Sequence, residues 1–178
     1  MQHKLLDKSR RTEIADLFRS VFTSSEGEKE GERVGQLSSA LASKIDNQEI
    51  ICLGADEDER LAGAIFFSRL RFDSALRVYL LAPVAVSTAY QGEGVGQALI
   101  NYGLKQIKRC GADIVITYGD PCFYSKLGFQ PLPETVIQAP LRLSMPQGWQ
   151  GQSLTGVTIP SIHGRPTCVK PFNDPVYW

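Results

Sequence analysis

Hydrophobic positions near the N-terminus recur with the period of an α-helix. Residues 12–22 (TEIADLFRSVF) place five large apolar side chains on one face, and Thr12 stands where an N-cap is expected. Residues 34–45 repeat the pattern in steps of three and four, which predicts a second amphipathic helix. Residues 24–33 (SSEGEKEGER) carry no apolar side chain, so we expect a polar loop between the two helices.

After these helices the pattern changes to that of strands. Glu49–Ala55 and Leu61–Ser68 are short apolar runs separated by the charged turn Asp56–Arg60, and together they predict a hairpin. Leu76–Val86 is a longer apolar run and predicts a third strand. Because Pro83 lies inside this run and has no N–H to donate, we expect a bulge or broken pairing at that point.

The second half of the chain alternates between helix and strand patterns. We expect a helix from about Val95 to Arg109 and then a buried strand over Asp113–Thr117. Pro121–Leu127 is typical of a short helix, and Gly128 suits the left-handed cap that would stop it.

From Phe129 onward the chain is rich in Pro and Gly. Strand-like pieces occur near Val136–Ala139 and Val157–Ile159. Taken in order, the predicted helices and strands indicate an α/β domain built on a mixed sheet.

Composition narrows the class of protein without assigning a function. The 178 residues are 43% hydrophobic and 21% charged, values typical of one soluble globular domain. Nineteen basic and nineteen acidic side chains cancel, so no overall field favours nucleic acid or a membrane surface as partner. The apolar runs are too short to span a bilayer, and the opening residues do not resemble a secretory signal.

Four dispersed cysteines form no CxxC pair, which argues against a structural zinc site. Free thiols in a reducing compartment are expected instead, and therefore a cytoplasmic location. These cysteines are Cys52, Cys110, Cys122 and Cys168.

The segment Leu80–Gly96 (LLAPVAVSTAYQGEGVG) carries the strongest chemical signal. A buried strand runs into the glycine-rich residues Gln91–Gly96, which open a helix. Glycines let backbone N–H groups approach a ligand, and a helix N-terminus adds unpaired donors, so the loop suits a phosphate or diphosphate. The spacing fits neither a P-loop nor a dinucleotide fingerprint, and a glycine turn that merely caps a helix is the structural alternative. Glu93 would point outward.

Two motifs resemble the GCN5-related N-acetyltransferases (GNAT). Gln91-x-x-Gly94-x-Gly96 is similar to the (R/Q)xxGxG/A signature of that superfamily, and Tyr124–Phe129 (YSKLGF) is similar to its YxKxGF segment. The resemblance covers residues 5–133 and is nearest to the YhbS-like predicted bacterial acetyltransferases. It implies an N-acetyltransferase domain over residues 1–133, with a C-terminal extension over 134–178 packed on it. The implied sheet is mixed and mostly antiparallel, flanked by helices, with splayed central strands.

The resemblance also implies where acetyl-CoA, the expected co-substrate, would bind. The strands matching Leu76–Val86 and Asp113–Thr117 would splay around it, and Tyr124 would lie near the thioester sulfur. Backbone groups would pair with the pantetheine arm at Val84, Ala85 and Val86. The diphosphate would sit on the amides of Gln91, Gly92, Glu93, Gly94, Val95 and Gly96.

The reaction expected of such a site is direct attack by a primary amine in a ternary complex. The amine must first lose a proton, because an ammonium group cannot attack a carbonyl. The Val86 N–H is the candidate donor to the oxyanion, and Tyr124 is the candidate proton donor to the departing thiolate. The acceptor would be a small-molecule or protein amine, and no metal is required.

Other side chains have weaker claims, and alternatives remain open. Tyr124 can be read as a core aromatic, Cys122 as a buried or semi-exposed thiol rather than a nucleophile, and Lys126 as a CoA phosphate contact or a solvated residue. His3 and His163 are expected on the surface or in tails. The resemblance implies that part of the acceptor groove lies between the first two helices, where acidic side chains could attract a cationic amine. A solvated acidic loop is the simpler interpretation of these residues, which are Glu26, Glu28, Glu30 and Glu32.

Two broader alternatives concern the whole chain. The first is a non-catalytic acyl-CoA-binding or sensing module. The second is a structural interaction domain in which the glycines only cap a helix. The aromatic end Pro175–Trp178 would pack on the core or form a homodimer contact.

Overall fold

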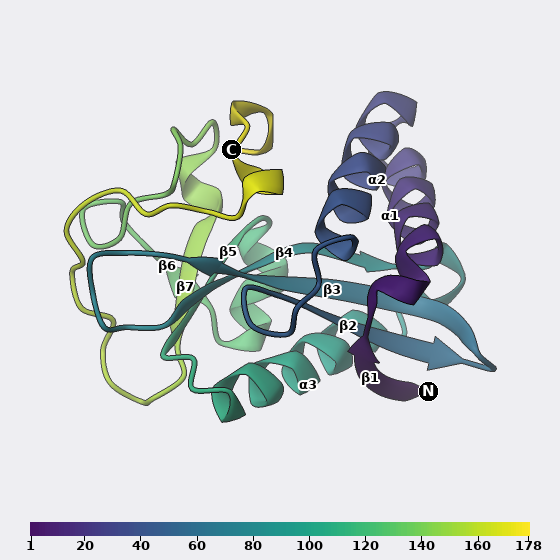
Figure 1. Cartoon of the computed structure of the whole chain (residues 1–178), viewed down its shortest axis with the longest axis horizontal. Coiled ribbons are helices and arrows are strands. Elements are labelled where there is room, and N and C mark those ends of the chain that lie inside the picture. The colour runs from purple at the N-terminus through teal and green to yellow at the C-terminus, as the bar shows by residue number, and fades with distance from the viewer. The chain divides into compact units, whose positions relative to one another are not determined.

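The computed structural model describes all 178 residues, which form a seven-stranded sheet flanked by helices (Figure 1). The strand order is β1-β2-β3-β4-β5-β7-β6. The β4–β5 pair is parallel, whereas the β1–β2, β5–β7 and β6–β7 pairs are antiparallel, which confirms the expected mixed sheet. The strands are β1 (Gln2–Leu6), β2 (Ile50–Glu57), β3 (Arg60–Leu70), β4 (Val78–Val86), β5 (Ile114–Tyr118), β6 (Gln130–Pro131) and β7 (Trp149–Ser153). The helices are α1 (Arg11–Glu26), α2 (Glu28–Ala42), α3 (Val95–Arg109) and α4 (Pro121–Tyr124).

The chain divides into two compact units by its internal contacts. The first unit comprises residues 1–67 and 83–103, and the second comprises residues 68–82 and 104–178. The expected boundary at residue 133 stays a prediction, and residues 134–178 fall within the second unit.

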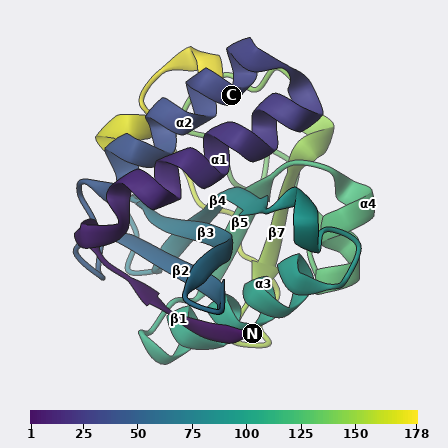
Figure 2. The ribbon, with the colours of Figure 1, turned by 90° about the vertical axis from the view of Figure 1, so that its right-hand side faces the viewer.

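In the first unit, α1 and α2 lie side by side (Figures 1 and 2). Buried residues on the two helices include Phe18 and Leu41, and the Phe18 ring packs 5.8 Å from that of Phe66 on β3. A Cβ added at Gly31 would overlap the Thr23 side chain and lie 2.8 Å from the Arg19 carbonyl oxygen. A glycine at this position therefore lets the two helices approach closely.

The polar loop expected over residues 24–33 is wrong, because this segment is helical except around Gly27. Gly27 adopts a positive φ of 97° and separates α1 from α2. Glu28 and Glu30 occupy the first turn of α2, where acidic side chains are favoured by the helix dipole. Helix formation in a polar segment thus depends on its ends and charge pairs as well as on an apolar stripe.

The N-terminal residues also differ from expectation. The structure starts with β1, which pairs with β2 from Gln2–Asp56 to Leu6–Cys52. Helix α1 starts at Arg11 after a 3₁₀ turn that Asp7 caps, so Thr12 is not an N-cap. Only Leu6 of β1 is buried, which explains why no apolar alternation marks this strand.

In the second unit, β4 and β5 run parallel from the pair Val78–Ile114 to the pair Leu81–Thr117. Strand β4 itself continues through Pro83, whereas the β4–β5 register ends at Leu81, before that proline. The bulge or broken pairing expected at Pro83 stays a prediction. The short helix expected after β5 is confirmed: α4 is followed by a 3₁₀ turn, and Gly128 ends it with a φ of 89°.

The strand pieces expected at residues 136–139 and 157–159 are wrong. Residues 134–136 form a turn, in which the Val136 N–H donates to the Pro133 carbonyl. The extension instead supplies β7, which pairs with β5 in antiparallel register. Strand β7 has the sequence WQGQS, so its polar residues gave no apolar pattern from which to predict it.

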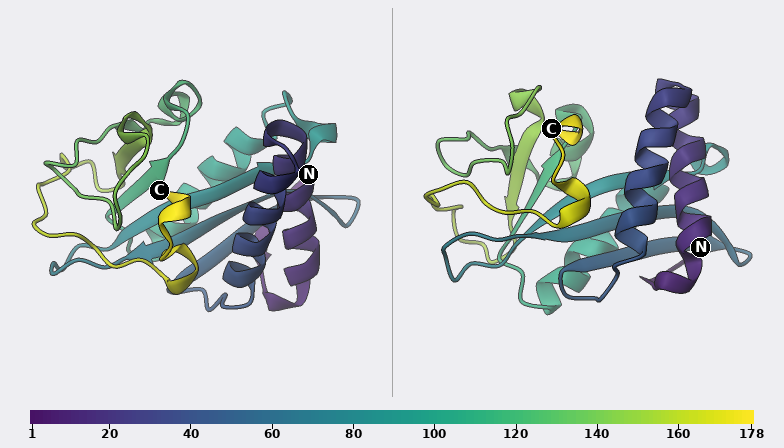
Figure 3. Two further views of the ribbon diagram at one scale, coloured as in Figure 1. Left: turned by 90° about the horizontal axis from the view of Figure 1, so that it is seen from above. Right: turned by 45° about the horizontal axis from the view of Figure 1, so that its top comes forward.

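Aromatic side chains hold the C-terminal end against the sheet of the second unit. The chain returns to β7 at its C-terminus (Figures 1 and 3), where Trp178 lies 6.1 Å from Trp149 and 6.2 Å from Tyr118 between ring centroids. The Trp178 indole N–H donates to the Phe172 carbonyl oxygen. Packing of the aromatic end on the core, one of the two expected roles, is therefore what the structure contains.

Candidate active site

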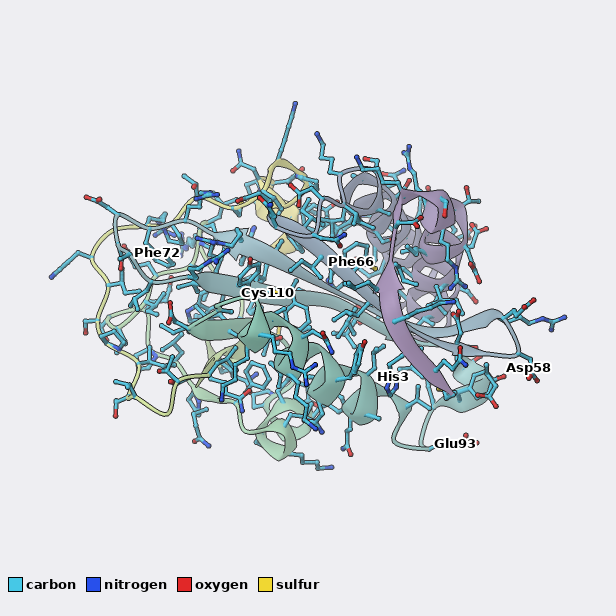
Figure 4. All side chains as sticks on the ribbon, turned by 60° about the horizontal axis from the view of Figure 1, so that its bottom comes forward. His3, Asp58, Phe66, Phe72, Glu93 and Cys110 are labelled. Carbon is cyan, nitrogen blue, oxygen red and sulfur yellow. The ribbon has the colours of Figure 1, made fainter.

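The glycine-rich loop lies in the first unit, between the end of β4 and the first turn of α3. Gly92 and Gly94 have positive φ angles of 81° and 79°, which side chains with a Cβ rarely adopt. A Cβ built at either glycine would meet no atom within 4 Å, so the space beside both residues is open. Exposed Glu93 lies between them at the outer turn of the loop (Figure 4). The loop therefore presents backbone rather than side chains to a ligand.

The side chain of Gln91 ties this loop to the strand before it. Its Nε2 donates to the Val86 carbonyl oxygen at 2.8 Å. Next along the chain from Val86, the Ser87 N–H donates to the Ala62 carbonyl oxygen on β3, also at 2.8 Å. Because the Gln91 amide is engaged within the protein, it is the main chain of Gln91 that is available to a ligand.

The three residues expected to pair with a pantetheine arm form the end of β4. Val84 and Val86 are half-buried, whereas Ala85 is buried. A Cβ added at Gly63 of β3 would lie 3.3 Å from the Ala85 carbonyl oxygen, so β3 approaches β4 closely here. At the far end of the loop the buried Val95 side chain anchors the start of α3. The structure thus brings the strand end and the loop together in one unit.

Tyr124 lies in the second unit, at the end of α4. The turn before this helix is fixed by Asp120, whose carboxylate accepts from the Cys122 N–H at 2.9 Å, and Pro121 occupies the first helical position. The Tyr124 ring makes edge-to-face contacts with Phe123 at 5.0 Å and with Phe129 at 5.6 Å. The aromatic packing and the capped turn together hold the phenol.

The environment of the Tyr124 hydroxyl favours its protonated form. Burial raises the pKa of this phenol above its ordinary value, a hydrogen bond with Thr117 lowers it, and the charge of Asp120 raises it, with a net increase. The phenol is therefore neutral near pH 7 and able to donate a proton.

Two neighbours of Tyr124 were not singled out in the sequence. Thr117 is fully buried at the end of the apolar run IVIT, and Gly119 leaves room for the ring, since a Cβ there would lie 2.8 Å from the tyrosine Cε2. A lone threonine closing an apolar strand was the only signal for the first.

The other candidate residues from the sequence are not neighbours of the glycine-rich loop or of Tyr124 in any contact described above. Cys122 is a free, exposed thiol rather than a buried one, and His163 is exposed. His3 is not in a tail but belongs to β1 (Figure 4), and its ring lies 5.2 Å from that of Tyr102 at an interplanar angle of 33°. Burial and then the N-terminal charge lower the pKa of His3. No group of three or more His, Cys, Asp or Glu side chains is arranged to hold a metal ion.

The acidic residues at the end of α1 and the start of α2 are exposed or paired with arginines. Glu30 accepts from Arg33 at 2.8 Å, and Glu32 accepts from Arg19 at 3.0 Å. These pairs stabilise helix geometry and point to no ligand. Separately, none of the helices is both long enough and apolar enough to cross a lipid bilayer.

Comparison with known proteins identifies a domain within the chain. The model of the acetyltransferase (GNAT) domain matches residues 48–131, a segment that contains both motifs. Residues 48–131 therefore match a GNAT acetyltransferase domain. It is 29% identical over 174 residues to the uncharacterized N-acetyltransferase YjhQ of Escherichia coli, a match that covers 94% of this chain and 91% of YjhQ. Over 79 residues it is 32% identical to E. coli YhbS, covering 44% of this chain and 47% of that GNAT protein.

Solved GNAT structures share the fold over nearly the whole chain. The crystal structure of E. coli YhbS in complex with CoA matches with a TM-score of 0.79 and 24% identity, covering 97% of this chain and 92% of YhbS. A GNAT family acetyltransferase of Brucella melitensis in complex with acetyl-CoA matches with a TM-score of 0.65 and 25% identity, covering 94% and 93%.

Proposed function

We propose that this chain transfers the acetyl group of acetyl-CoA to a primary amine by direct attack in a ternary complex. The observation that carries the proposal is the open glycine loop at the start of α3, tied to the end of β4 by the Gln91 amide. The complexes of E. coli YhbS with CoA and of the Brucella enzyme with acetyl-CoA support it. The acceptor is a small-molecule or protein amine.

The residues of the loop fit a diphosphate group. Both positive-φ glycines leave open space beside the main chain, and α3 contributes the unpaired N–H groups of its first turn. Backbone donors at a helix N-terminus attract an anion without requiring a charged side chain. In this proposal the main chain of Gln91–Gly96 holds the diphosphate, and the main chain of Val84–Val86 pairs with the pantetheine arm.

The chemistry requires a stabilised oxyanion and a protonated leaving group. The Val86 N–H is the proposed donor to the oxyanion that forms when the neutral amine attacks. Tyr124 is the proposed general acid, which gives its phenolic proton to the thiolate as the tetrahedral intermediate collapses. The role requires a phenol that is protonated at the start of each turnover, and a phenol with a pKa of about 10 or higher meets this condition near pH 7.

A non-catalytic acyl-CoA-binding module is the alternative. The presence of Tyr124 in the YxKxGF-like segment favours the enzyme, because binding alone needs no proton donor. Calorimetry with CoA and an acetylation assay on a panel of amines, with release of the CoA thiol as readout, separate the two. Binding with turnover of at least one amine is expected. Binding without turnover across the panel would favour the sensing module, and no binding would contradict both.

A further inference from the structure

Strand β7 carries two glutamines, Gln150 and Gln152, whose amides bond to the segment that bears Tyr124. The two glutamines are two residues apart, so both side chains leave the strand on the same face of the sheet. Gln150 is fully buried, and the side-chain oxygen of half-buried Gln152 is buried as well. A buried amide requires hydrogen-bond partners. The carbonyl groups that these amides contact therefore indicate what the pair does.

Gln150 holds the start of that segment. Its Nε2 donates to the carbonyl oxygens of Gly119 and Gly148, each at 3.2 Å, as the two N–H groups of an amide nitrogen permit. The Gly119 N–H donates in turn to the Gly148 carbonyl oxygen at 3.0 Å. Both polar groups of the Gly119 main chain are thus engaged, next to the Tyr124 ring that covers this glycine.

Gln152 holds the end of the same segment. Its Nε2 donates to the carbonyl oxygen of Leu127, the last residue of the 3₁₀ turn that follows α4, at 3.1 Å. A Cβ added at Gly128 would overlap this nitrogen, so the amide can approach the turn only because the next residue is glycine. Since a carbonyl group can only accept, the nitrogen and not the oxygen of the Gln152 amide must face Leu127.

The oxygen of the Gln152 amide indicates that this hydrogen bond serves more than stability. Oε1 is buried and has no hydrogen-bond partner in the protein. An unpartnered buried acceptor opposes folding by an amount comparable to what one hydrogen bond contributes. The net stabilisation from the amide is therefore small, which leaves the geometry that it imposes on the Leu127 carbonyl as its main effect.

Tyr124 lies between the two fixed carbonyls. Its N–H donates to the Asp120 carbonyl oxygen at 3.1 Å, and its own carbonyl oxygen accepts from the Phe129 N–H at 3.3 Å. The ring is held by the edge-to-face contacts with Phe123 and Phe129. Because the main chain is fixed before and after this residue, the turn cannot shift without breaking a hydrogen bond to a β7 side chain.

We propose that Gln152 is a positioning residue for Tyr124, and that together with Gln150 it fixes both ends of residues 119–127 and thereby sets where the phenol hydroxyl lies. This inference rests on the proposed function, in which Tyr124 is the general acid. A general acid transfers its proton only within hydrogen-bond reach of the group that receives it. A misplacement of about 1 Å can cost about 10²-fold in rate, so a small displacement of the turn is enough to slow the chemical step.

The Gln152→Met variant tests the role, since it keeps the length of the side chain and removes the amide. Turnover (kcat) should fall about tenfold, because the turn loses its anchor, while the KM for acetyl-CoA should be unchanged. Gln147→Met, at an exposed glutamine shortly before β7, is the matched control and should behave as the wild type. Should Gln152→Met fail to fold, Gln152→Asn, whose amide is one methylene shorter, replaces it with the same expected directions.

A double variant separates positioning from a merely structural role. In the Tyr124→Phe background, Gln152→Met should cause no further loss of turnover, because the hydroxyl that it positions is already absent. A merely structural role would change turnover equally in both backgrounds or in neither.

Amide hydrogen exchange gives a readout that needs no activity. The Phe129 N–H, which donates to the Tyr124 carbonyl oxygen, should exchange faster in Gln152→Met than in Gln147→Met. The amides of β5 should exchange at the same rate in both variants, which would exclude a general loss of stability as the cause.

The outcomes distinguish this inference from the proposed function. Full turnover by Tyr124→Phe would overturn the acid role, and the positioning role with it. Impaired Tyr124→Phe together with a Gln152→Met protein that turns over as its control would overturn the positioning role alone. Unchanged exchange of the Phe129 amide, or a further tenfold loss of turnover in the double variant, would also overturn it.

Discussion

At the scale of single residues, the candidate site depends on what side chains do for the backbone. Gln91 and Thr117 each donate to a main-chain carbonyl, of Val86 and Leu81 respectively. Sequence motifs identified Gln91 and Tyr124 but not the direction of either side chain, because direction is set by tertiary neighbours. The motif positions were therefore predictable, whereas the hydrogen bonds that hold them were not.

Tyr124→Phe should lower turnover by about 10²-fold or more, as expected for loss of a general acid, with the affinity for acetyl-CoA nearly unchanged. The ring keeps its contacts with Phe123 and Phe129, so folding should be preserved. Thiol-release kinetics and calorimetry with CoA provide the two measurements. Tyr102→Phe is the control for a tyrosine elsewhere, and equal turnover in both variants would eliminate Tyr124 as the acid.

Gln91→Ala should raise the KM for acetyl-CoA by roughly tenfold, because one hydrogen bond that orders the loop is lost and is worth about 1 kcal/mol or slightly more. Gln91→Glu should be worse, since a carboxylate would face the Val86 carbonyl oxygen. Gln2→Ala, at an exposed glutamine of β1, is the control. A KM for Gln91→Ala equal to that of the control would contradict the tethering role.

At the scale of elements, the success of prediction followed the strength of the local pattern. Helix α3 spans the predicted residues Val95–Arg109, and the glycine cap after α4 was also correct. Strands β1 and β7 were missed because their sequences are polar and their pairing partners are remote in the chain. Such strands owe their conformation to the ladder they join rather than to their own composition.

Gly31 gives a test of helix packing. Alanine in a helix interior normally stabilises relative to glycine by roughly 1 kcal/mol. Gly31→Ala should instead lower the free energy of unfolding by about 1–3 kcal/mol, because its Cβ would press on the side chain and backbone of Thr23 and on the Arg19 carbonyl. Urea denaturation measures the change. Lys29→Ala, at an exposed position of α2, is the control, and a stabilised Gly31→Ala protein would refute the close packing.

At the scale of the whole molecule, a net charge of zero conceals an uneven distribution. The first unit contains nine basic and fourteen acidic side chains, and the second contains ten basic and five acidic ones. The units therefore carry formal charges of −5 and +5. The net charge of the whole sequence hides this difference between the two units, because the division into units depends on the fold.

Acid stability should report one charged cluster of the first unit. Burial raises the pKa of Asp56, but hydrogen bonds from Lys4 and Arg10 outweigh this and lower it overall. A lowered pKa stabilises the fold above the ordinary carboxyl range, and this contribution is lost as the pH falls through the folded-state value. Asp56→Asn should thus lose less unfolding free energy than the wild type between pH 7 and pH 3.

Urea titrations at the two pH values provide the measurement. Asp58→Asn, in the exposed turn after β2, should follow the wild type. A pH dependence of Asp56→Asn as steep as that of the wild type would show that the cluster does not govern acid unfolding.

The tether from Gln91 to Val86 has a consequence for how separate fragments of one ligand would behave. A nucleotide piece that settles only on the loop would also restrain the strand end, so a pantetheine piece added afterwards would find its backbone partners already ordered. The two fragments should then bind with positive cooperativity although neither touches the other. Removing the Gln91 amide should abolish this cooperativity between the two fragments.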